Sequence, residues 1–508
     1  MAAPSLPFRY RLLRGLVRLI VRLFFREVAV QGRENVPADR GGLLVAWHPN
    51  GLIDPALILA EFPERIVFGA RDGLLRWPLL GAMMRGLGTV PIYRAVDQEG
   101  MSAEARREAN AQSLGALADE IAGGSFSALF PEGQSHDHPH LTDLRTGAAR
   151  LYLLARERTP EGQPPPVIVP VGLHYEDKDV FRTDVLVAYH PPMELPADLT
   201  AEMDADSPAD EDAEREQARR LTDAIEDALV RAVHPTADWT LHALMHRARS
   251  LMRAEGARRR GDKLGPESVV SRTIGFAQIW EGYRVRSETH PGEIEDLRRD
   301  ITGYDRLMRR LGLADADLDH APALGSPLLA LITLGQLVAV YLLLPPLLVL
   351  GYAVNAPPYW LLKPVARAVA KTEKDAATIK LIGGFVLFPL AWITAGVLAA
   401  LGAVRLAALL PDLPDTPVLV GLVVAVLSAL GGVVALRYTE LAKGTWRGVR
   451  VRLTRRRHPE RLDALRDLRA DLFDRFFALT PGLDIPTSLT RRPAPTTAAA
   501  PSQAERGG

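Results

Sequence analysis

Short runs rich in β-branched residues alternate with longer stretches of helical spacing between residues 28 and 189. This alternation predicts an α/β domain in which helices cover the faces of a sheet. About seven strands are expected, at Glu27–Gln31, Gly42–Trp47, Ile66–Ala70, Val90–Tyr93, Ser127–Phe130, Val167–Leu173 and Asp184–Tyr189. Helices are expected near Ala56–Glu61, Ala103–Ala122 and Gly147–Arg156.

The first 27 residues carry a helical pattern of their own. Arginines recur every three or four positions beside leucines, at Arg11, Arg14, Arg18, Arg22 and Arg26. At about 100° per helical residue these arginines form one cationic stripe. We expect an amphipathic helix over residues 1–27, lying either on an anionic membrane surface or against its own domain.

Three stretches toward the C-terminus contain no charged residue: Leu328–Leu344, Leu381–Val404 and Val418–Leu436. They approach the roughly 20 apolar residues needed to cross a bilayer, so a membrane region of three to four segments is expected over residues 324–436. A further segment at Pro345–Leu362, broken by prolines, would make the number of crossings even. The positive-inside rule then places the N-terminal domain and the basic tail after Arg437 in the cytoplasm.

The remaining boundaries follow composition. Residues 196–213 are acidic and rich in turn formers, which predicts a linker that closes a domain over residues 28–195. Residues 214–323 predict a helical extension, residues 437–490 a basic helical tail, and residues 491–508 a disordered tail.

Charge and cysteine content exclude several classes of function. The chain holds 61 Lys+Arg and 61 Asp+Glu residues, so a nucleic-acid polyanion is not an expected partner. It contains no cysteine, which excludes disulfides, thiolate metal sites and a cysteine-linked intermediate.

A histidine at a strand end is the first candidate for chemistry. His48 follows the predicted strand Gly42–Trp47, Pro49 favours extended geometry for it, and Asn50-Gly51 supplies a turn. Asp54 is close enough to fold back and accept a hydrogen bond from one ring nitrogen, so that the other can take a proton from a hydroxyl. The alternative is structural, with Asp54 as the N-cap of the next helix and Pro55 in its first position.

Three further blocks follow in order. They are Gly88-Thr89-Val90-Pro91-Ile92-Tyr93-Arg94, Phe130-Pro131-Glu132-Gly133-Gln134-Ser135 and Val169-Pro170-Val171-Gly172. With the His48 block, they resemble the PlsC-type glycerolipid acyltransferases across residues 28–190. In this chain five residues separate His48 from Asp54, one more than in the commonest version of the family signature.

The resemblance implies a fold and a set of roles. The fold is the acyltransferase-type mixed sheet, and His48 and Asp54 are the catalytic pair. Arg94 would hold the phosphate of the acceptor, with Arg71 as a second candidate, because a guanidinium can bind phosphate through two hydrogen bonds. The other residues implied in acceptor binding are Glu132, Gly133, Gly88 and Pro91.

The implied activity is direct transfer of a fatty acyl group from a thioester, acyl-CoA or acyl-carrier protein, to a hydroxyl of a phosphorylated glycerol. No cofactor and no metal are expected. The segment from Lys374 to Lys380 resembles the fungal-type glycerol-3-phosphate or dihydroxyacetone-phosphate acyltransferases. Together with the longer spacing after His48, this resemblance favours glycerol-3-phosphate as acceptor. Lysophosphatidic acid is the alternative acceptor, and a catalytically silent lipid-binding scaffold is the alternative of another class.

One cluster competes with this interpretation. His136, His138 and His140 lie with Asp137 and Asp143 directly after the third block and could form a metal site by composition. Alternating polar residues after a turn favour a solvated loop instead, because no second cluster supplies fixed geometry.

Overall fold

The computed structural model describes residues 6–93, 102–178, 180–196, 199, 211–319, 327–369, 376–409 and 416–490. The chain forms two compact units. The first comprises Met1–Pro235, Val269–Ala277 and Pro486–Gly508, and the second comprises Thr236–Ser268 and Gln278–Ile485. The sequence-based domain boundaries remain predictions.

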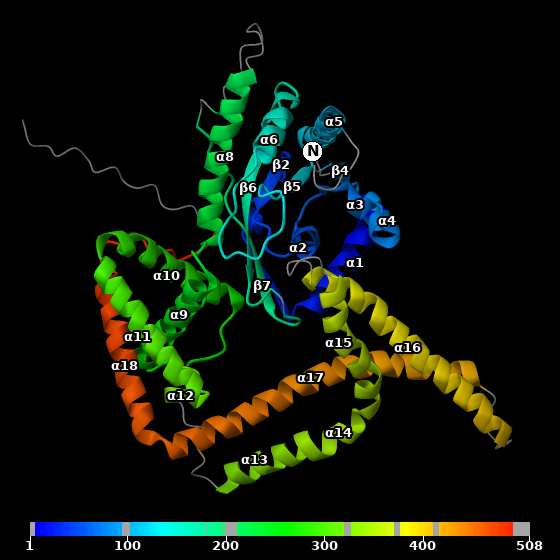
Figure 1. The fold of residues 1–508 in the computed structure, drawn as a ribbon, viewed down its shortest axis with the longest axis vertical. Coiled ribbons are helices and arrows are strands. Elements are labelled where there is room, and N and C mark those ends of the chain that lie inside the picture. The colour runs from blue at the N-terminus through cyan, green and yellow to red at the C-terminus, as the bar shows by residue number, and fades with distance from the viewer. Residues whose placement is uncertain are drawn as a thin grey trace, which may run out of the picture. The chain divides into compact units, whose positions relative to one another are not determined.

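The first unit is built on one mixed sheet, as predicted (Figure 1). Its strands are β1 Glu27–Gln31, β2 Gly42–Ala46, β3 Ile66–Arg71, β4 Val90–Ile92, β5 Phe126–Leu129, β6 Val167–Tyr175 and β7 Asp184–Tyr189. Their order is β1-β7-β6-β2-β5-β3-β4, and every neighbouring pair is parallel except β6 and β7. The predicted fold class is therefore confirmed, with the C-terminal ends of β2, β5, β3, β4 and β6 at one edge.

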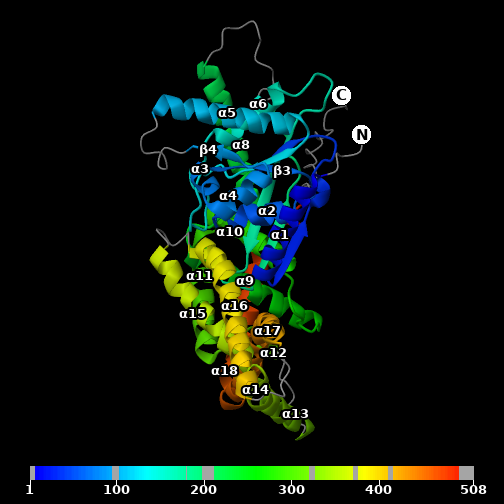
Figure 2. The same cartoon turned by 90° about the vertical axis from the view of Figure 1, so that its right-hand side faces the viewer.

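Helices cover both faces of this sheet. They are α1 Phe8–Phe24, η1 Arg33–Asn35, α2 Ile53–Glu61, α3 Asp72–Leu75, α4 Pro78–Gly86, α5 Ala103–Ala122, α6 Gly147–Glu157 and α8 Glu211–Val233. Helices α5, α6 and α8 bury Leu43, Val45 and Ile168 on one face. Helices α1 and α2 pack together (Figure 2). Helix α2 also contacts β7. Because β2 lies inside the sheet and is covered on both faces, all five of its residues are buried.

The arginines of helix α1 do not all face solvent as one cationic stripe. Arg14 donates to the carbonyl of Phe62, and Arg18 donates to the carbonyl of Ala60 over 3.1 Å, both at the C-terminal end of α2. Cations stabilise that end of a helix, where the last carbonyls lack partners. Five large apolar residues face outward, with exposed fractions of 71% at Phe8, 62% at Leu12, 46% at Leu16, 55% at Leu19 and 49% at Leu23. The other apolar face of α1 is buried, through Tyr10, Val17, Val21 and Phe24.

The second unit is helical. It contains α9 Trp239–Arg260, the latter part of α10 Val269–Thr289, α11 Pro291–Leu311, α12 Ala316–Asp319, α13 Pro327–Val338, the π-helical turn η3 Ala339–Leu343, α14 Leu344–Leu347, α15 Val349–Val369, α16 Ala376–Leu409, α17 Pro417–Arg457 and α18 Pro459–Ala478. Helices α9, α11 and α18 share one apolar core with the end of α17.

Helices α15, α16 and α17 approach closely at glycines. A Cβ on Gly351 would lie 2.7 Å from the carbonyl of Gly431, and one on Gly396 would lie 2.7 Å from that of Gly421. Asn355 lies between the three helices: it donates to the carbonyl of Ser428 over 2.9 Å and accepts from the Trp392 indole over 2.9 Å. Small residues and such polar contacts are typical of helices packed in lipid.

Two helical segments among the described residues, Gly383–Leu409 and Pro417–Arg457, are long and apolar enough to cross a membrane, by length and composition alone. They contain most of the predicted segment Leu381–Val404 and all of Val418–Leu436. The third predicted segment, Leu328–Leu344, is divided among α13, η3 and the first residue of α14.

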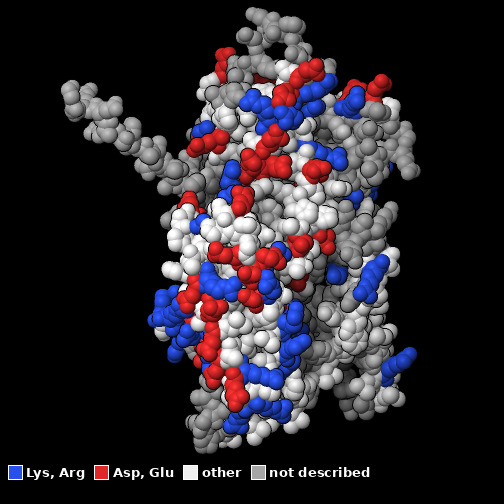
Figure 3. Space-filling model, turned by 60° about the vertical axis from the view of Figure 1, so that its left-hand side comes forward, with Lys and Arg blue, Asp and Glu red and all other residues white. Residues whose placement is uncertain are grey.

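The visible face in Figure 3 carries acidic and basic side chains interspersed, in keeping with the balanced composition.

Candidate active site

The candidate residues gather at the edge where the parallel strands end. His48 follows β2, Phe130 follows β5, Arg71 ends β3 and Pro91 lies in β4. Since β2, β5, β3 and β4 are parallel neighbours, their C-terminal ends lie side by side. Open α/β sheets bind ligands at this edge.

A tight turn brings Asp54 back to His48. Gly51 has a φ of +44°, which favours glycine, and α2 begins at Ile53. Asp54 therefore lies in the first turn of α2 rather than at its N-cap, which is Leu52. One oxygen, Oδ2, accepts from the N–H of Asn50 over 2.7 Å and lies 2.8 Å from Nδ1 of His48.

The carboxylate of Asp54 is buried and fully engaged. Its other oxygen, Oδ1, accepts a hydrogen bond from the hydroxyl of Tyr175 at the end of β6. Burial and the nearby Asp54 charge raise the pKa of Tyr175 well above its ordinary value, so the phenol remains a neutral donor. With Oδ2 accepting the proton of Nδ1, the tautomer of His48 leaves Nε2 with a free lone pair.

The ring of His48 is packed on one side and partly exposed to solvent. It stacks on Phe130 at a centroid distance of 4.1 Å and an interplanar angle of 14°. Its side chain is 17% exposed, and no described residue forms a hydrogen bond with Nε2. An oriented imidazole with one accessible basic nitrogen can accept a proton from a bound hydroxyl.

Glu132 lies beneath His48 and has a 0% exposed side chain. Its Oε2 accepts from the backbone N–H of His48 over 2.7 Å. Its Oε1 accepts from the N–H of Thr142 over 3.0 Å and lies 2.6 Å from Nε2 of His136.

His136 is not part of a solvated loop, because only 4% of it is exposed. Its Nδ1 accepts from the N–H of His138 over 3.2 Å, so Nε2 carries the hydrogen that is donated to Glu132. Both nitrogens are therefore occupied, and within the described part of the chain no group of three or more acidic or histidine side chains is arranged for a metal. The expected absence of a metal stays a prediction.

The other described residues predicted to bind the acceptor lie on separate turns and strands. Gly133 has a φ of +70° and lies under Arg145, whose Cδ would be 3.0 Å from an added Cβ. Gly88 has a φ of +80° in the turn between α4 and β4. Arg71 is exposed at the end of β3, and Arg94 falls outside the described residues. Their binding roles remain predictions.

Two contributors were missed from the sequence. Tyr175 lies 121 positions from Asp54, and only the pairing of β2 with β6 would have brought its strand end to the site. Composition predicts His136 as a metal ligand or a residue of a solvated loop. Its spacing of four positions from Glu132 is the sequence signal that indicates the observed contact.

Comparison with known proteins assigns one segment of the chain to a family. The model of the acyltransferase family matches residues 27–174, the segment that contains strands β1 to β5, most of β6, and His48. Residues 27–174 form a PlsC-type acyltransferase domain. The matched segment contains His48 and Asp54, whose catalytic roles remain predictions.

Individual relatives are distant. The chain is 24% identical to glycerol-3-phosphate O-acyltransferase 1 of Saccharomyces cerevisiae over 52% of its own length and 32% of that protein. It is 30% identical to the lyso-ornithine lipid O-acyltransferase of Rhodobacter capsulatus over 29% of its length and 48% of that protein. The crystal structure of the lysophosphatidic acid acyltransferase PlsC from Thermotoga maritima aligns with a TM-score of 0.27 and 20% identity, over 44% of this chain and 84% of that one. The chain spans less than half the length of each curated relative it matches.

Proposed function

We propose that the protein is a membrane-bound O-acyltransferase that moves a fatty acyl group from a thioester to a hydroxyl of a phosphorylated glycerol. The observation that carries this proposal is the open Nε2 of His48, oriented by a buried carboxylate in an acyltransferase domain. The general base that this reaction needs is thereby supplied.

The reaction proceeds in one transfer. Nε2 of His48 takes the proton of the acceptor hydroxyl while the oxygen attacks the thioester carbonyl carbon. The resulting tetrahedral species collapses, the C–S bond breaks, and the thiolate receives the proton from His48. Asp54 stabilises the imidazolium that forms between the two steps. The backbone N–H of Asn50 already donates to Asp54. It is therefore not one of the donors that stabilise the negatively charged oxygen of the tetrahedral species.

Arg71 and Arg94 are the proposed phosphate ligands, and acyl-CoA or acyl-carrier protein is the proposed donor. No cofactor takes part. Glycerol-3-phosphate is the favoured acceptor, supported by the similarity to the yeast enzyme of that name. Lysophosphatidic acid is the second candidate, supported by the similarity to an enzyme named for a lyso-lipid acceptor.

The test is ester formation by the purified full chain. Labelled acyl-CoA and acyl-carrier protein are supplied with glycerol-3-phosphate, dihydroxyacetone phosphate, lysophosphatidic acid and lyso-ornithine lipid. We expect ester with glycerol-3-phosphate and none with His48→Ala. Ester formation by His48→Ala at the wild-type rate would contradict the role of His48, and lipid binding without any ester would favour the scaffold.

The membrane placement is proposed from α1. Its outward ridge of Phe8, Leu12, Leu16, Leu19 and Leu23 lies within about 80° of the helix circumference at 100° per residue. Exposed arginines flank this ridge: Arg9 on one side, Arg11 and Arg22 on the other. Such a helix inserts its apolar face into lipid while the cations contact anionic head groups. The cytoplasmic face remains the proposed side for the catalytic domain.

The absence of cysteine allows this placement to be measured. A single cysteine at Leu12, Leu16 or Leu19 is labelled with an environment-sensitive fluorophore in the full chain, reconstituted in anionic vesicles. Nitroxide-bearing lipids should quench these labels but not a label at Arg150, which is exposed on α6 over the other face of the sheet. Ridge labels that lipid nitroxides leave bright would show that protein or water covers α1.

A further inference from the structure

The segment from Glu132 to His136 holds the backbone of His48 from both sides. The N–H of His48 donates to Oε2 of Glu132 over 2.7 Å. The carbonyl of His48 accepts from the N–H of His136 over 3.1 Å. The position of the His48 backbone therefore depends on this segment, whereas Asp54 orients only the ring.

Glu132 has little capacity left for a ligand. Three donors already reach its two oxygens, from His48, Thr142 and His136. Its side chain is 0% exposed. Because this carboxylate is buried, an acceptor hydroxyl could reach it only if the surrounding protein groups moved aside.

His136 orients the carboxylate of Glu132. Its ring is fixed by the N–H of His138 at Nδ1 and by the edge-on indole of Trp47, at a centroid distance of 6.2 Å. The neighbouring Asp137 pairs with Lys178 over 2.8 Å, which ties the loop to the connection between β6 and β7. The ring of His136 thus enters the site from a loop that is anchored on both sides.

We propose that His136 is a positioning residue that acts through Glu132 on the backbone of His48, and that Glu132 positions His48 rather than binding the acceptor. The kinetic consequence rests on the proposed acyl transfer, while the structural consequence does not. A buried carboxylate that loses one of three donors moves to recover it. Movement of His48 by about 1 Å lowers turnover by about 100-fold without changing how the acceptor binds.

The first experiment separates kcat from KM. His136→Ala should lower kcat by about 10- to 100-fold with the acceptor KM within about twofold of wild type. His136→Gln should retain kcat within about threefold, because its side-chain amide can donate where Nε2 does. His136→Asn is too short to reach Glu132 and should resemble His136→Ala. The matched control is His140→Ala, a histidine of the same loop whose ring stacks on His138.

The second experiment needs no turnover. Hydrogen exchange of a peptide covering residues 43–52 in the full chain should accelerate about tenfold or more in His136→Ala and stay at the wild-type rate in His136→Gln. If exchange responds as expected but no acceptor is acylated, the proposed function is wrong and the positioning role stands. Unchanged exchange and kcat in His136→Ala overturn the proposal, and so does a Glu132→Gln variant that raises the acceptor KM tenfold at unchanged kcat.

Discussion

Each unit buries an aspartate that accepts a hydrogen bond from a tyrosine hydroxyl, yet only one of the two carboxylates belongs to a candidate site. Asp54 accepts from Tyr175, and Asp315 accepts from Tyr304 over 2.6 Å. Asp54 is 0% exposed and Asp315 is 2% exposed. Burial and the adjacent carboxylate raise the tyrosine pKa in both places. Burial, charge and a perturbed tyrosine therefore do not identify function by themselves.

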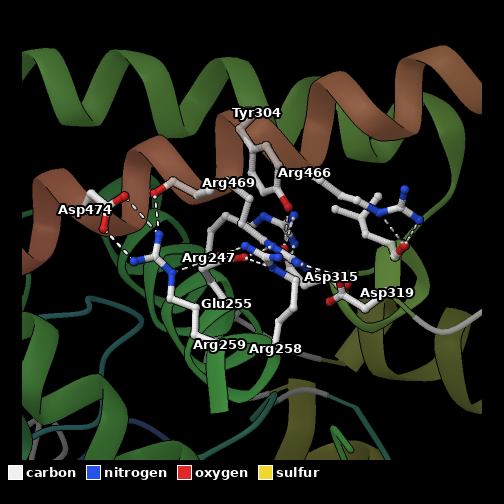
Figure 4. Close-up of polar contacts among 12 residues, drawn as sticks. Arg247, Glu255, Arg258, Arg259, Tyr304, Asp315, Asp319, Arg466, Arg469 and Asp474 are labelled. Carbon is white, nitrogen blue, oxygen red and sulfur yellow. Dashed lines mark hydrogen bonds and ion pairs between the residues drawn. The ribbon is translucent and has the colours of Figure 1, made fainter. Parts of the chain in front are cut away.

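The difference lies in the remaining partners. Asp315 also accepts from Ser250 over 2.8 Å and pairs with Arg247 over 3.0 Å. Next to it, the 0% exposed Arg469 pairs with Glu255 and Asp319 and donates to the carbonyl of Asp315 (Figure 4). These groups satisfy one another and link α9, α12 and α18. Asp54 instead orients an imidazole whose second nitrogen is open, which is what proton transfer requires.

The largest effect separates the two aspartates directly. Asp54→Asn should lower kcat by about 10⁴-fold, because an amide no longer stabilises the imidazolium or selects its tautomer. Asp315→Asn should leave kcat per folded molecule within about twofold. Both variants are assayed for ester formation, with folding checked by thermal unfolding in detergent. If Asp54→Asn retains a tenth of wild-type kcat, Asp54 does not have the catalytic role that distinguishes it from Asp315.

The second effect concerns stability in the other unit. Arg469→Met should destabilise the helical core by about 3–5 kcal/mol, because Glu255 and Asp319 lose a buried partner. The matched control is Arg299→Met, an exposed residue paired with Asp296 three positions earlier, for which a change below about 0.5 kcal/mol is expected. Hydrogen exchange of α18 peptides measures both. Equal protection in the two variants would mean that the buried cluster contributes no more than a surface pair.

The sequence predicts these two regions unequally. Strand positions follow β-branched runs, so the predicted β1 and β7 have the observed bounds and the other strands differ by one or two residues at their ends. The return of Asp54 to His48 is local, and the turn at Asn50-Gly51 predicts it. The cluster around Arg469 joins residues more than 200 positions apart, which no local pattern reveals.

The orientation of α1 could not be read from periodicity for a related reason. The spacing places the arginines in one stripe, but Arg14 and Arg18 find carbonyls of α2 at its C-terminal end, and Arg26 pairs with Asp184. These partners depend on the packing of α1 beside α2. Periodicity defines the two faces of a helix, and tertiary contacts decide which one is covered.

A third effect comes from a buried ionisable group with neither an opposite charge nor an open site. Burial lowers the pKa of His190, which follows β7, to about 4 from 6.5. Between these values the unfolded chain binds a proton that the folded chain does not, so stability falls as pH falls. The loss should reach about 2 kcal/mol by pH 5.

His190→Leu should remove this part of the pH dependence. Hydrogen exchange of β7 peptides between pH 7 and 5, corrected for intrinsic rates, measures it. Burial also lowers the pKa of His234, to about 3, so an acid-induced loss remains in the variant but becomes smaller. An identical pH dependence with and without His190 would contradict the assignment.

The smallest effect tests whether Tyr175 contributes to catalysis or only to packing, as Tyr304 does in the helical core. Tyr175→Phe removes one of three donors to Asp54, and kcat should fall by about tenfold with the acceptor KM unchanged. The carboxylate would then attract the imidazolium more strongly, so the acidic limb of the pH profile of kcat/KM should move to higher pH. Tyr152→Phe, a buried tyrosine of α6 in the core beneath the sheet, is the control and should change neither quantity. If kcat falls but the acidic limb of the kcat/KM profile does not move, Tyr175 has only a packing role. The loss of a hydroxyl that serves packing lowers activity through stability and leaves the pH profile unchanged.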